Sequence, residues 1–306
     1  MKVLNPDGGR GPWRPGGPDG AFMTLCYFIH ERERIRLRRE SGTPGPWTKD
    51  PILRDAFFTN VDRRSDFGTR WFVDNVYAHR KDDIDLVRRI LTCRLINRID
   101  TIRLLGVDRG RQPWPVPQKA REKLLKAAEA GAPVLAIAHM TATPHDGERS
   151  EPGTGLRRWV DEVLLTAWRE ASLIARALSE PGAGLRDAFA AFKSLPCVGD
   201  FLANQLALDL SLCADLGHTG LLADAGDKAD FAHPGPGAKA MLRELETPMT
   251  AAGVLRIRDL LNEAFFGIRR LEAQDVEHAL CEAWKYTKIL RGGRIHRRWS
   301  AERTAR

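Results

Sequence analysis

Apolar residues recur at three- and four-residue spacing through most of the chain, which is the period of an amphipathic α-helix. The pattern begins with Phe22, Leu25 and Ile29 and ends before the Gly- and Pro-rich segment 41–46. The later helices are expected at residues 61–79, 83–105, 116–130, 155–178, 184–193, 199–214, 236–246, 254–267 and 272–290. Only 133–140 has the character of a strand, so the strand–helix alternation of a Rossmann or kinase architecture is absent. We predict a mainly α-helical fold.

Composition divides the 306 residues into three segments. Residues 1–20 hold six glycines and four prolines and are predicted to form a flexible tail. Residues 21–290 form the helical domain, for which one large unit and two lobes both remain open. Residues 291–306 form a basic tail.

The charge balance and the lengths of the apolar runs limit the classes of binding partner that this chain can have. Lys and Arg number 48 against 40 Asp and Glu, a net charge of +8 that favours DNA or RNA over an acidic partner. No apolar run reaches the roughly 20 residues of a membrane helix, and no signal peptide is evident, so we expect a cytoplasmic protein without a membrane partner. The five cysteines are widely spaced and the histidines lack ligand spacing, so we assign no metal and no other cofactor.

The sequence contains no GxxxxGK[ST] motif, which argues against an autonomous P-loop kinase. The Gly235-Pro236-Gly237 turn still opens an expected helix, with Lys239 one turn further on. Free backbone amides and the positive end of a helix dipole attract anions, so this turn is a candidate phosphate site. An ordinary helix start is the alternative.

A short turn, 195–199, joins two expected helices in the manner of a helix-hairpin-helix DNA-binding element. Gly199 would let the backbone approach a DNA phosphate closely. Gln205 and Asp209 follow four residues apart on the next helix. The alternative is an ordinary helix–helix turn.

Residues 59–71 place Asn60, Arg63, Arg64 and Arg70 three to four residues apart, with Asp66 close enough to orient the guanidinium groups. Arginines held in this way can clamp a phosphate with two hydrogen bonds. A surface network of ion pairs is the alternative.

Basic and aromatic residues also alternate near the C-terminus, from Lys285 to Trp299, as expected for phosphate contact combined with base stacking. A frayed basic tail is the alternative. Carboxylates that could act as a general base or stabilise charge are Asp66, Asp209 and Asp227.

Several blocks share one family pattern. In chain order they are 28–32 (FIHER), 46–53 (PWTKDPIL), 58–61 (FTNV), Arg64, Asp66, 69–71 (TRW), 94–97 (RLIN), 100–101 (DT), 195–210, 235–237 (GPG), 274–275 (QD), 281–282 (CE) and 285–286 (KY). Together they resemble the helical domain found with 5-hydroxymethyluracil DNA kinases, over nearly everything after residue 20. The sequence departs from the pattern at His233-Pro234, ahead of the GPG turn, and at Cys197 in the hairpin.

The resemblance implies a part in DNA base hypermodification. Related enzymes that build modified thymines belong to the DNA glycosylase superfamily, which implies a glycosylase-like helical fold with a helix-hairpin-helix element. It also implies that Asp227 occupies the place nearest to that of the glycosylase carboxylate. As a separate hypothesis, we expect Asn60 or Asn97 to read a pyrimidine edge.

Three hypotheses follow for the function. The first is a transferase-type enzyme that flips a 5-hydroxymethylpyrimidine out of DNA and assists group transfer at its exocyclic methylene. The second is a non-catalytic helical module that brings a separate kinase or transferase to modified DNA. The third is a base-excision DNA glycosylase.

Overall fold

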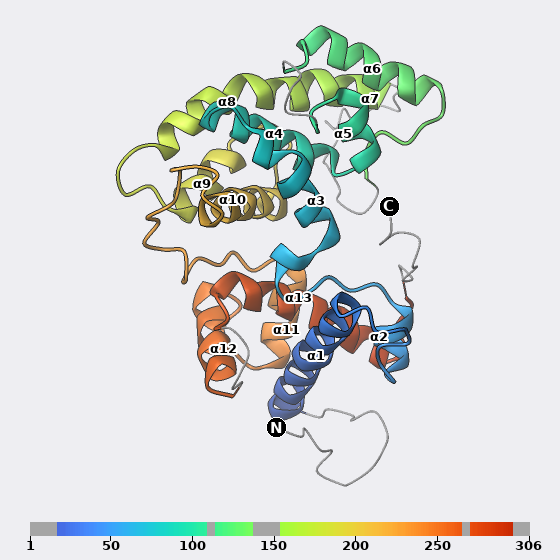
Figure 1. Cartoon of the computed structure of the whole chain (residues 1–306). Coiled ribbons are helices and arrows are strands. Elements are labelled where there is room, and N and C mark those ends of the chain that lie inside the picture. The colour runs from blue at the N-terminus through green and yellow to red at the C-terminus, as the bar shows by residue number, and fades with distance from the viewer. Residues whose placement is uncertain (1–16, 109–113, 137–153, 265–269, 296–306) are drawn as a thin grey trace. The chain divides into compact units, whose positions relative to one another are not determined.

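The computed structural model describes residues 17–108, 114–136, 154–264 and 270–295. Their contacts divide the chain into two compact units (Figure 1). Unit 1 combines the chain up to Asp66 with the chain from Ala229 onward, and unit 2 is the segment Phe67–Lys228. All regular secondary structure in the described residues is helical, which confirms the predicted mainly α-helical fold.

Unit 1 is built around α13 (Ala273–Leu290), which packs against α11 (Pro236–Glu244) and α1 (Gly17–Glu40). The other helices of this unit, α2 (Pro51–Asp55) and α12 (Ala251–Ala264), also contact α13. Burying a large apolar side chain contributes about 1.5–3 kcal/mol. The core of unit 1 includes Leu25, Phe28, Ile29, Met241, Leu242, Val276 and Leu280.

Unit 2 is built around α4 (Asp83–Ile96), which packs against α8 (Leu165–Leu178) and α10 (Asp200–Asp215). In the same unit, α10 also packs against α9 (Leu185–Lys193). The remaining helices are α3 (Phe67–Asn75), α5 (Ile99–Leu105), α6 (Pro117–Glu129) and α7 (Thr154–Arg158), and a π-helical turn, Trp159–Leu164, joins α7 to α8.

Two expected helices are broken by local capping. The helix expected at 61–79 is a 3-10 turn, Arg63–Ser65, followed by α3 and a second 3-10 turn, Tyr77–His79. The Asp62 carboxylate accepts the Arg64 N–H, and extended backbone at Asp66 separates the first turn from α3. The helix expected at 83–105 ends at Asn97, whose φ of 48° is left-handed, and α5 starts anew.

Other expectations differ at their boundaries. A strand was expected at 133–140, but residues 133–136 are irregular. The Ala136 N–H donates to the carbonyl of Ile96 at the end of α4, at 3.1 Å, and not to a neighbouring strand. Residues 137–140 lie outside the described residues. The first helix starts at Gly17, inside the segment expected to be a tail. None of the described helices is long and apolar enough to span a membrane.

Candidate functional site

In unit 1, the segment 57–66 runs along α13 in the opposite chain direction. At one end the Lys285 ammonium donates to the Phe57 carbonyl, and the Glu282 carboxylate accepts the Thr59 N–H at 3.1 Å. Toward the other end, the Arg63 guanidinium favours the charged form of Glu277. Residues more than 200 positions apart in the sequence therefore form one polar layer, which we call the α13 cluster: Asn60, Arg63, Asp66, Glu277, Glu282 and Lys285.

Asp66 closes the loop that carries the cluster. Its Oδ1 accepts the Asn60 N–H at 2.8 Å, and its Oδ2 lies 3.0 Å from Nη1 of Arg63. The Asn60 amide nitrogen donates to the Ser65 carbonyl at 2.9 Å. Burial raises the pKa of Asp66, and the Arg63 charge and the Asn60 N–H oppose that rise. The side chain of Asp66 is 17% exposed as a whole, while its Oδ2 atom is buried beside Arg63.

Arg32 of α1 fixes the same loop from the other side. Its Nε donates to the Thr59 carbonyl at 3.1 Å, and its Nη2 donates to the Phe58 carbonyl at 3.1 Å and to the Asn60 side-chain oxygen at 2.9 Å. Burial lowers the pKa of Arg32 to about 10. Three acceptors from consecutive residues thus hold the loop in one conformation.

Glu277 lies on α13 beneath the start of α11. Its Oε1 accepts the Gly235 N–H at 3.2 Å, so the GPG turn already directs one amide at a carboxylate of its own unit. Burial raises the pKa of Glu277 to about 7. A carboxyl group with that pKa exchanges a proton readily at neutral pH, as a general acid or base must.

The GPG turn also has a packing role. A Cβ at Gly237 would lie 2.6 Å from Sγ of Cys281, so glycine lets α11 approach α13 closely. Lys239 is exposed on the next turn of α11. Polar atoms that flank the cluster in the sequence are not all paired: Oγ1 of Thr59 and, on α13, Nε2 of Gln274 are buried without a hydrogen-bond partner in the part of the chain that the structure describes. Such atoms cost free energy unless a ligand or water meets them.

Unit 2 places Asp209 differently. Its two oxygens face Arg94 at 2.5 Å from Nη2 and 2.7 Å from Nε, and the Tyr77 hydroxyl donates to Oδ2 at 2.5 Å. All three side chains are buried, and burial together with the Asp209 charge raises the pKa of Tyr77. The bidentate pair ties α10 to α4.

The expected hairpin is the turn between α9 and α10, where Gly199 caps α10 and is exposed. A Cβ at Gly199 would meet nothing within 4 Å, so its backbone is open to an approaching group. Gln205 is buried in α10. Asp227 accepts the Leu185 and Arg186 N–H groups at 2.8 and 3.0 Å, which caps α9.

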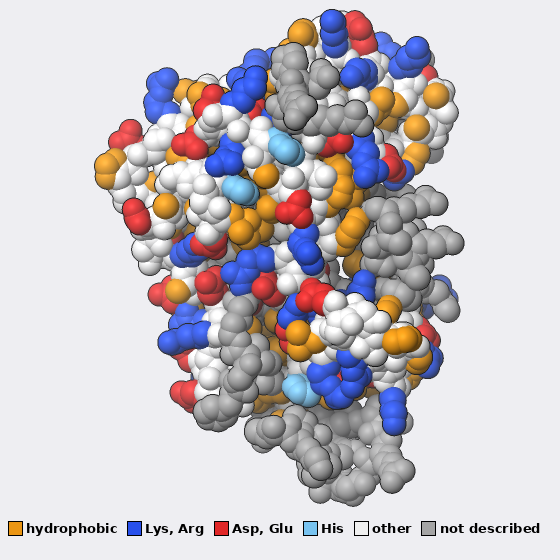
Figure 2. Space-filling view, viewed as in Figure 1, with side chains coloured by type: hydrophobic (Ala, Val, Ile, Leu, Met, Phe, Trp, Pro, Cys, Tyr) orange, Lys and Arg blue, Asp and Glu red, His pale blue; other side chains and the backbone are white. Residues whose placement is uncertain are grey.

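The remaining expected site residues are Arg64, Arg70 and Asn97. Arg64 pairs with Asp62 at 2.9 Å in unit 1 and is 37% exposed. Arg70 is exposed on α3, and Asn97 forms the left-handed end of α4, both in unit 2. On the face shown in Figure 2, Lys and Arg side chains are interspersed with Asp and Glu and form no field of one sign.

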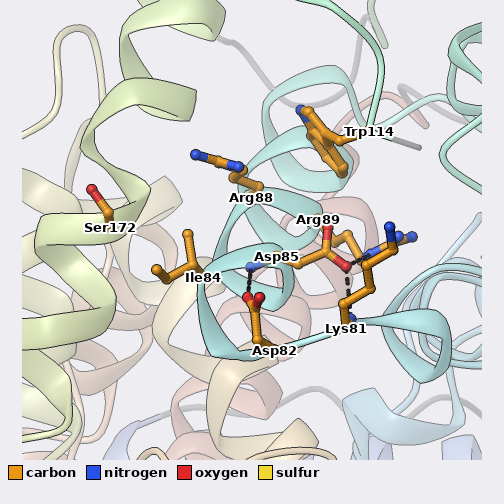
Figure 3. A pocket seen from close by; sticks show the side chains of 8 residues that line it. All are labelled: Lys81, Asp82, Ile84, Asp85, Arg88, Arg89, Trp114 and Ser172. Atoms are coloured by element: carbon orange, nitrogen blue, oxygen red, sulfur yellow. Dashed lines mark hydrogen bonds and ion pairs between the residues drawn. The ribbon is translucent and has the colours of Figure 1, made fainter.

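Unit 2 also contains a cavity of about 330 Å³ at the start of α4 (Figure 3). Its charged side chains are hydrogen-bonded to other groups of unit 2. Arg89 donates to Asp85 at 2.8 Å and to the Val107 carbonyl at 2.8 Å, and Asp82 accepts the Asp85 N–H at 2.8 Å. Arg88 donates to the Trp168 carbonyl at 3.2 Å. These charged groups are therefore already paired, whereas the indole Nε1 of Trp114 in the cavity wall is buried without a hydrogen-bond partner among the described residues.

A comparison with known protein families matches residues 19–293 to the family described as 5-hmdU DNA kinase, helical domain. The chain belongs to this family. Membership confirms the resemblance seen in the sequence, and the match spans both units.

A relative with a known activity is the 5-hmdU DNA kinase of Bacillus phage SP10, which is 28% identical over 238 residues. The aligned region is 72% of this chain and 36% of that protein, so the chain spans about a third of the relative's length. No solved structure matches the chain. The glycosylase-like fold and the helix-hairpin-helix element therefore remain predictions for this member of the helical-domain family.

Arg32, Glu277 and Glu282 were not expected as site residues from the sequence. The signal available was the spacing of polar residues on a largely buried helix, because Gln274, Glu277, Cys281 and Lys285 recur every three or four residues along α13. Buried polar residues on one helical face require partners, and this pattern indicates a facing polar layer.

Proposed function

We propose that this member of the family acts in the hypermodification of 5-hydroxymethyluracil in DNA, by holding a flipped 5-hydroxymethylpyrimidine while a group is transferred at its exocyclic methylene, to the hydroxymethyl oxygen. The family and the phage kinase supply the substrate class. The observation that carries the proposal is the α13 cluster, where a carboxyl group of pKa about 7 lies among cations and incompletely paired polar atoms.

In this proposal Glu277 accepts the proton of the hydroxymethyl O–H. The oxygen then forms the bond to the incoming group, for example the terminal phosphorus of a nucleoside triphosphate, and the bond from that phosphorus to the leaving oxygen breaks with its electron pair. Arg63 and Lys285 contribute positive charge to the layer, and Asp66 orients Arg63. Enzymes use such paired charges to stabilise charge that develops during transfer.

The proposal assigns DNA-backbone contacts to exposed groups. Arg64, Arg70 and Lys239 would contact phosphates in this account, and the open backbone at Gly199 allows a close approach. Asp209 and Asp227 hold unit 2 together in this account, because their oxygens already accept hydrogen bonds from Arg94 and from the start of α9.

A second candidate function is a non-catalytic module that delivers a separate kinase or transferase to modified DNA. It is favoured by one specific observation: the 306 residues contain no GxxxxGK[ST] motif, while the relative named a kinase is much longer than the shared region.

Both candidates are tested by incubating the purified chain with duplex DNA that contains 5-hydroxymethyluracil, with and without nucleoside triphosphates, and analysing the nucleosides by mass spectrometry. A new nucleoside that fails to form with Glu277→Gln and still forms with Glu244→Gln supports the first candidate. Binding without a chemical change supports the second. Release of the base contradicts both and indicates a base-excision glycosylase.

A further inference from the structure

Unit 1 contains a cavity of about 360 Å³ between α1, the loop before α2 and the segment that follows α2. We call it the Trp47 cavity. Its walls are mainly apolar, and the side chains that matter for the argument are Arg32, Arg39, Trp47, Leu53 and Phe58.

Arg32 provides the cavity with hydrogen-bond donors. Its side chain belongs to a residue only 6% exposed, and its Nε and Nη2 are held by the 58–60 segment. In the described parts of the chain, its Nη1 makes no hydrogen bond or ion pair. A guanidinium donates through every nitrogen and accepts through none, so Nη1 offers two N–H groups to a carbonyl or anionic oxygen.

Trp47 and Arg39 form another wall. The Arg39 guanidinium carbon lies 5.3 Å from the centroid of the Trp47 ring, and the Trp47 indole N–H donates to the Thr43 carbonyl at 2.6 Å. This hydrogen bond and the stacked guanidinium fix the ring plane. A fixed aromatic wall is a surface on which a nucleobase can stack.

Two arginines of the cavity wall interact electrostatically with Asp66 of the α13 cluster. Burial lowers the pKa of Arg32 and of Arg39, and the nearby Asp66 carboxylate counteracts that fall at both. Arg32 itself contacts Asn60, whose N–H is bound by Asp66. A group bound in the cavity therefore lies beside the loop that carries Asn60 and Asp66 of the cluster.

Size and chemistry limit the occupant. Ligand cavities range from about 300 to 1,000 Å³, so this one suits a single ring system better than a nucleoside triphosphate. Apolar walls with one set of buried donors favour a neutral planar heterocycle that carries a carbonyl oxygen.

We propose that the Trp47 cavity receives the extruded 5-hydroxymethyluracil ring, with Nη1 of Arg32 donating to O4 of the base and Trp47 covering one ring face. This inference rests on the proposed function and adds the base-binding residues. Cytosine carries an amino donor where uracil carries O4, so a donor at this position selects uracil-type over cytosine-type pyrimidines.

The test measures equilibrium binding of the full chain, by fluorescence anisotropy, to duplexes that differ at one position: 5-hydroxymethyluracil, 5-hydroxymethylcytosine or an abasic site. The wild type is expected to prefer 5-hydroxymethyluracil by roughly ten- to a hundredfold, the usual effect of a hydrogen bond to a charged group. Trp47→Ala and Arg32→Lys are expected to lose most of this preference while keeping their affinity for the abasic duplex. Arg34→Lys, on the same helix but outside the cavity, is the control and should match the wild type.

The outcomes separate the two proposals. A wild type that shows no preference for 5-hydroxymethyluracil over the abasic duplex contradicts the proposed function. A wild type with that preference, which Trp47→Ala and Arg32→Lys both retain, overturns the cavity assignment alone. Equal affinity of the wild type for the uracil and cytosine forms overturns the O4 contact. Thermal unfolding checks that Arg32→Lys folds, and Trp47→Ala decides the matter if it does not.

Discussion

Each unit contains a shielded carboxylate that faces an arginine, but the two pairs differ in how completely they are satisfied. In unit 2, Asp209 receives two hydrogen bonds from Arg94 and one from Tyr77, and all three side chains are buried. In unit 1, Asp66 meets Arg63 through one oxygen and both side chains are 17–18% exposed. Among the described residues, the hydroxyl of the nearby Thr59 has no hydrogen-bond partner.

The difference teaches which pair is available for function. A buried pair whose hydrogen bonds are complete offsets its own desolvation and has nothing left to offer a ligand. A part-exposed pair beside unpaired donors can gain contacts when a ligand binds. Asp66 and Asp209 are therefore equivalent in sequence type but not in physical role.

The largest expected effect on the free energy of unfolding comes from breaking the Arg94–Asp209 pair. Arg94→Met leaves the Asp209 charge buried without its partner and should lower the free energy of unfolding by about 3–5 kcal/mol. Urea denaturation measures this. Arg121→Met removes a more exposed pair of unit 2, with Asp161 at 2.7 Å, and should lower the free energy of unfolding much less. Equal losses in the two variants would mean that the buried pair does not hold unit 2 together.

The next effect concerns pH. Burial raises the pKa of Glu277 from 4.5 to about 7, so the folded protein holds a proton that the unfolded chain releases as the pH rises. Its stabilising contribution is complete below about pH 4.5 and is lost as the pH rises through about 7. Between about pH 5 and pH 8 the wild type should therefore lose stability relative to Glu277→Gln, by at most about 3 kcal/mol.

Glu244→Gln is the control for this pH dependence. The Arg291 guanidinium lowers the pKa of Glu244, so the stability that this carboxylate contributes is present at higher pH and is lost on acidification. Between about pH 5 and pH 8 the stability difference between the wild type and Glu244→Gln should thus stay constant, and it should fall only as the pH drops below about 4.5. A stability difference between the wild type and Glu277→Gln that stays constant with pH would contradict the assignment.

Substituting one glycine in each unit is expected to change stability less, and differently in the two units. Gly237→Ala in unit 1 should lower stability by roughly 1–3 kcal/mol, because the new methyl group meets Cys281. Gly199→Ala in unit 2 has open space around its Cβ and should change stability by less than about 1 kcal/mol. Thermal unfolding tests both, and Cys281→Ala should restore part of the loss in Gly237→Ala. If Gly199→Ala also keeps full affinity for DNA, the hairpin does not approach a phosphate.

A small change in stability is also expected for Asp66→Asn. The amide oxygen can still accept the Asn60 N–H, and the lost pair with Arg63 is part-exposed, so the cost should be about 1 kcal/mol. Formation of a new nucleoside on 5-hydroxymethyluracil DNA should nevertheless fall at least tenfold, because Arg63 is no longer oriented. Unchanged product formation would remove Asp66 from the proposed site.

The helices could be predicted because each depends on the local spacing of apolar residues. Their interruptions at Asp66 and Asn97 were missed, since capping by a carboxylate or a left-handed residue overrides apolar periodicity. The α13 cluster joins Thr59 to Glu282, and nothing local in either segment specifies that pairing. Asp227 illustrates the same limit, because its hydrogen bonds are made to residues 41 and 42 positions away.

Photo-crosslinking locates the bound base directly. A duplex in which one 5-iodouracil replaces the 5-hydroxymethyluracil is irradiated with the full chain, and the attached peptide is identified by mass spectrometry. Attachment at Trp47 or Phe58, beside Arg32 and the α13 cluster, is the result we predict. Attachment confined to unit 2, for example beside Gly199, would contradict the assignment of base binding to unit 1.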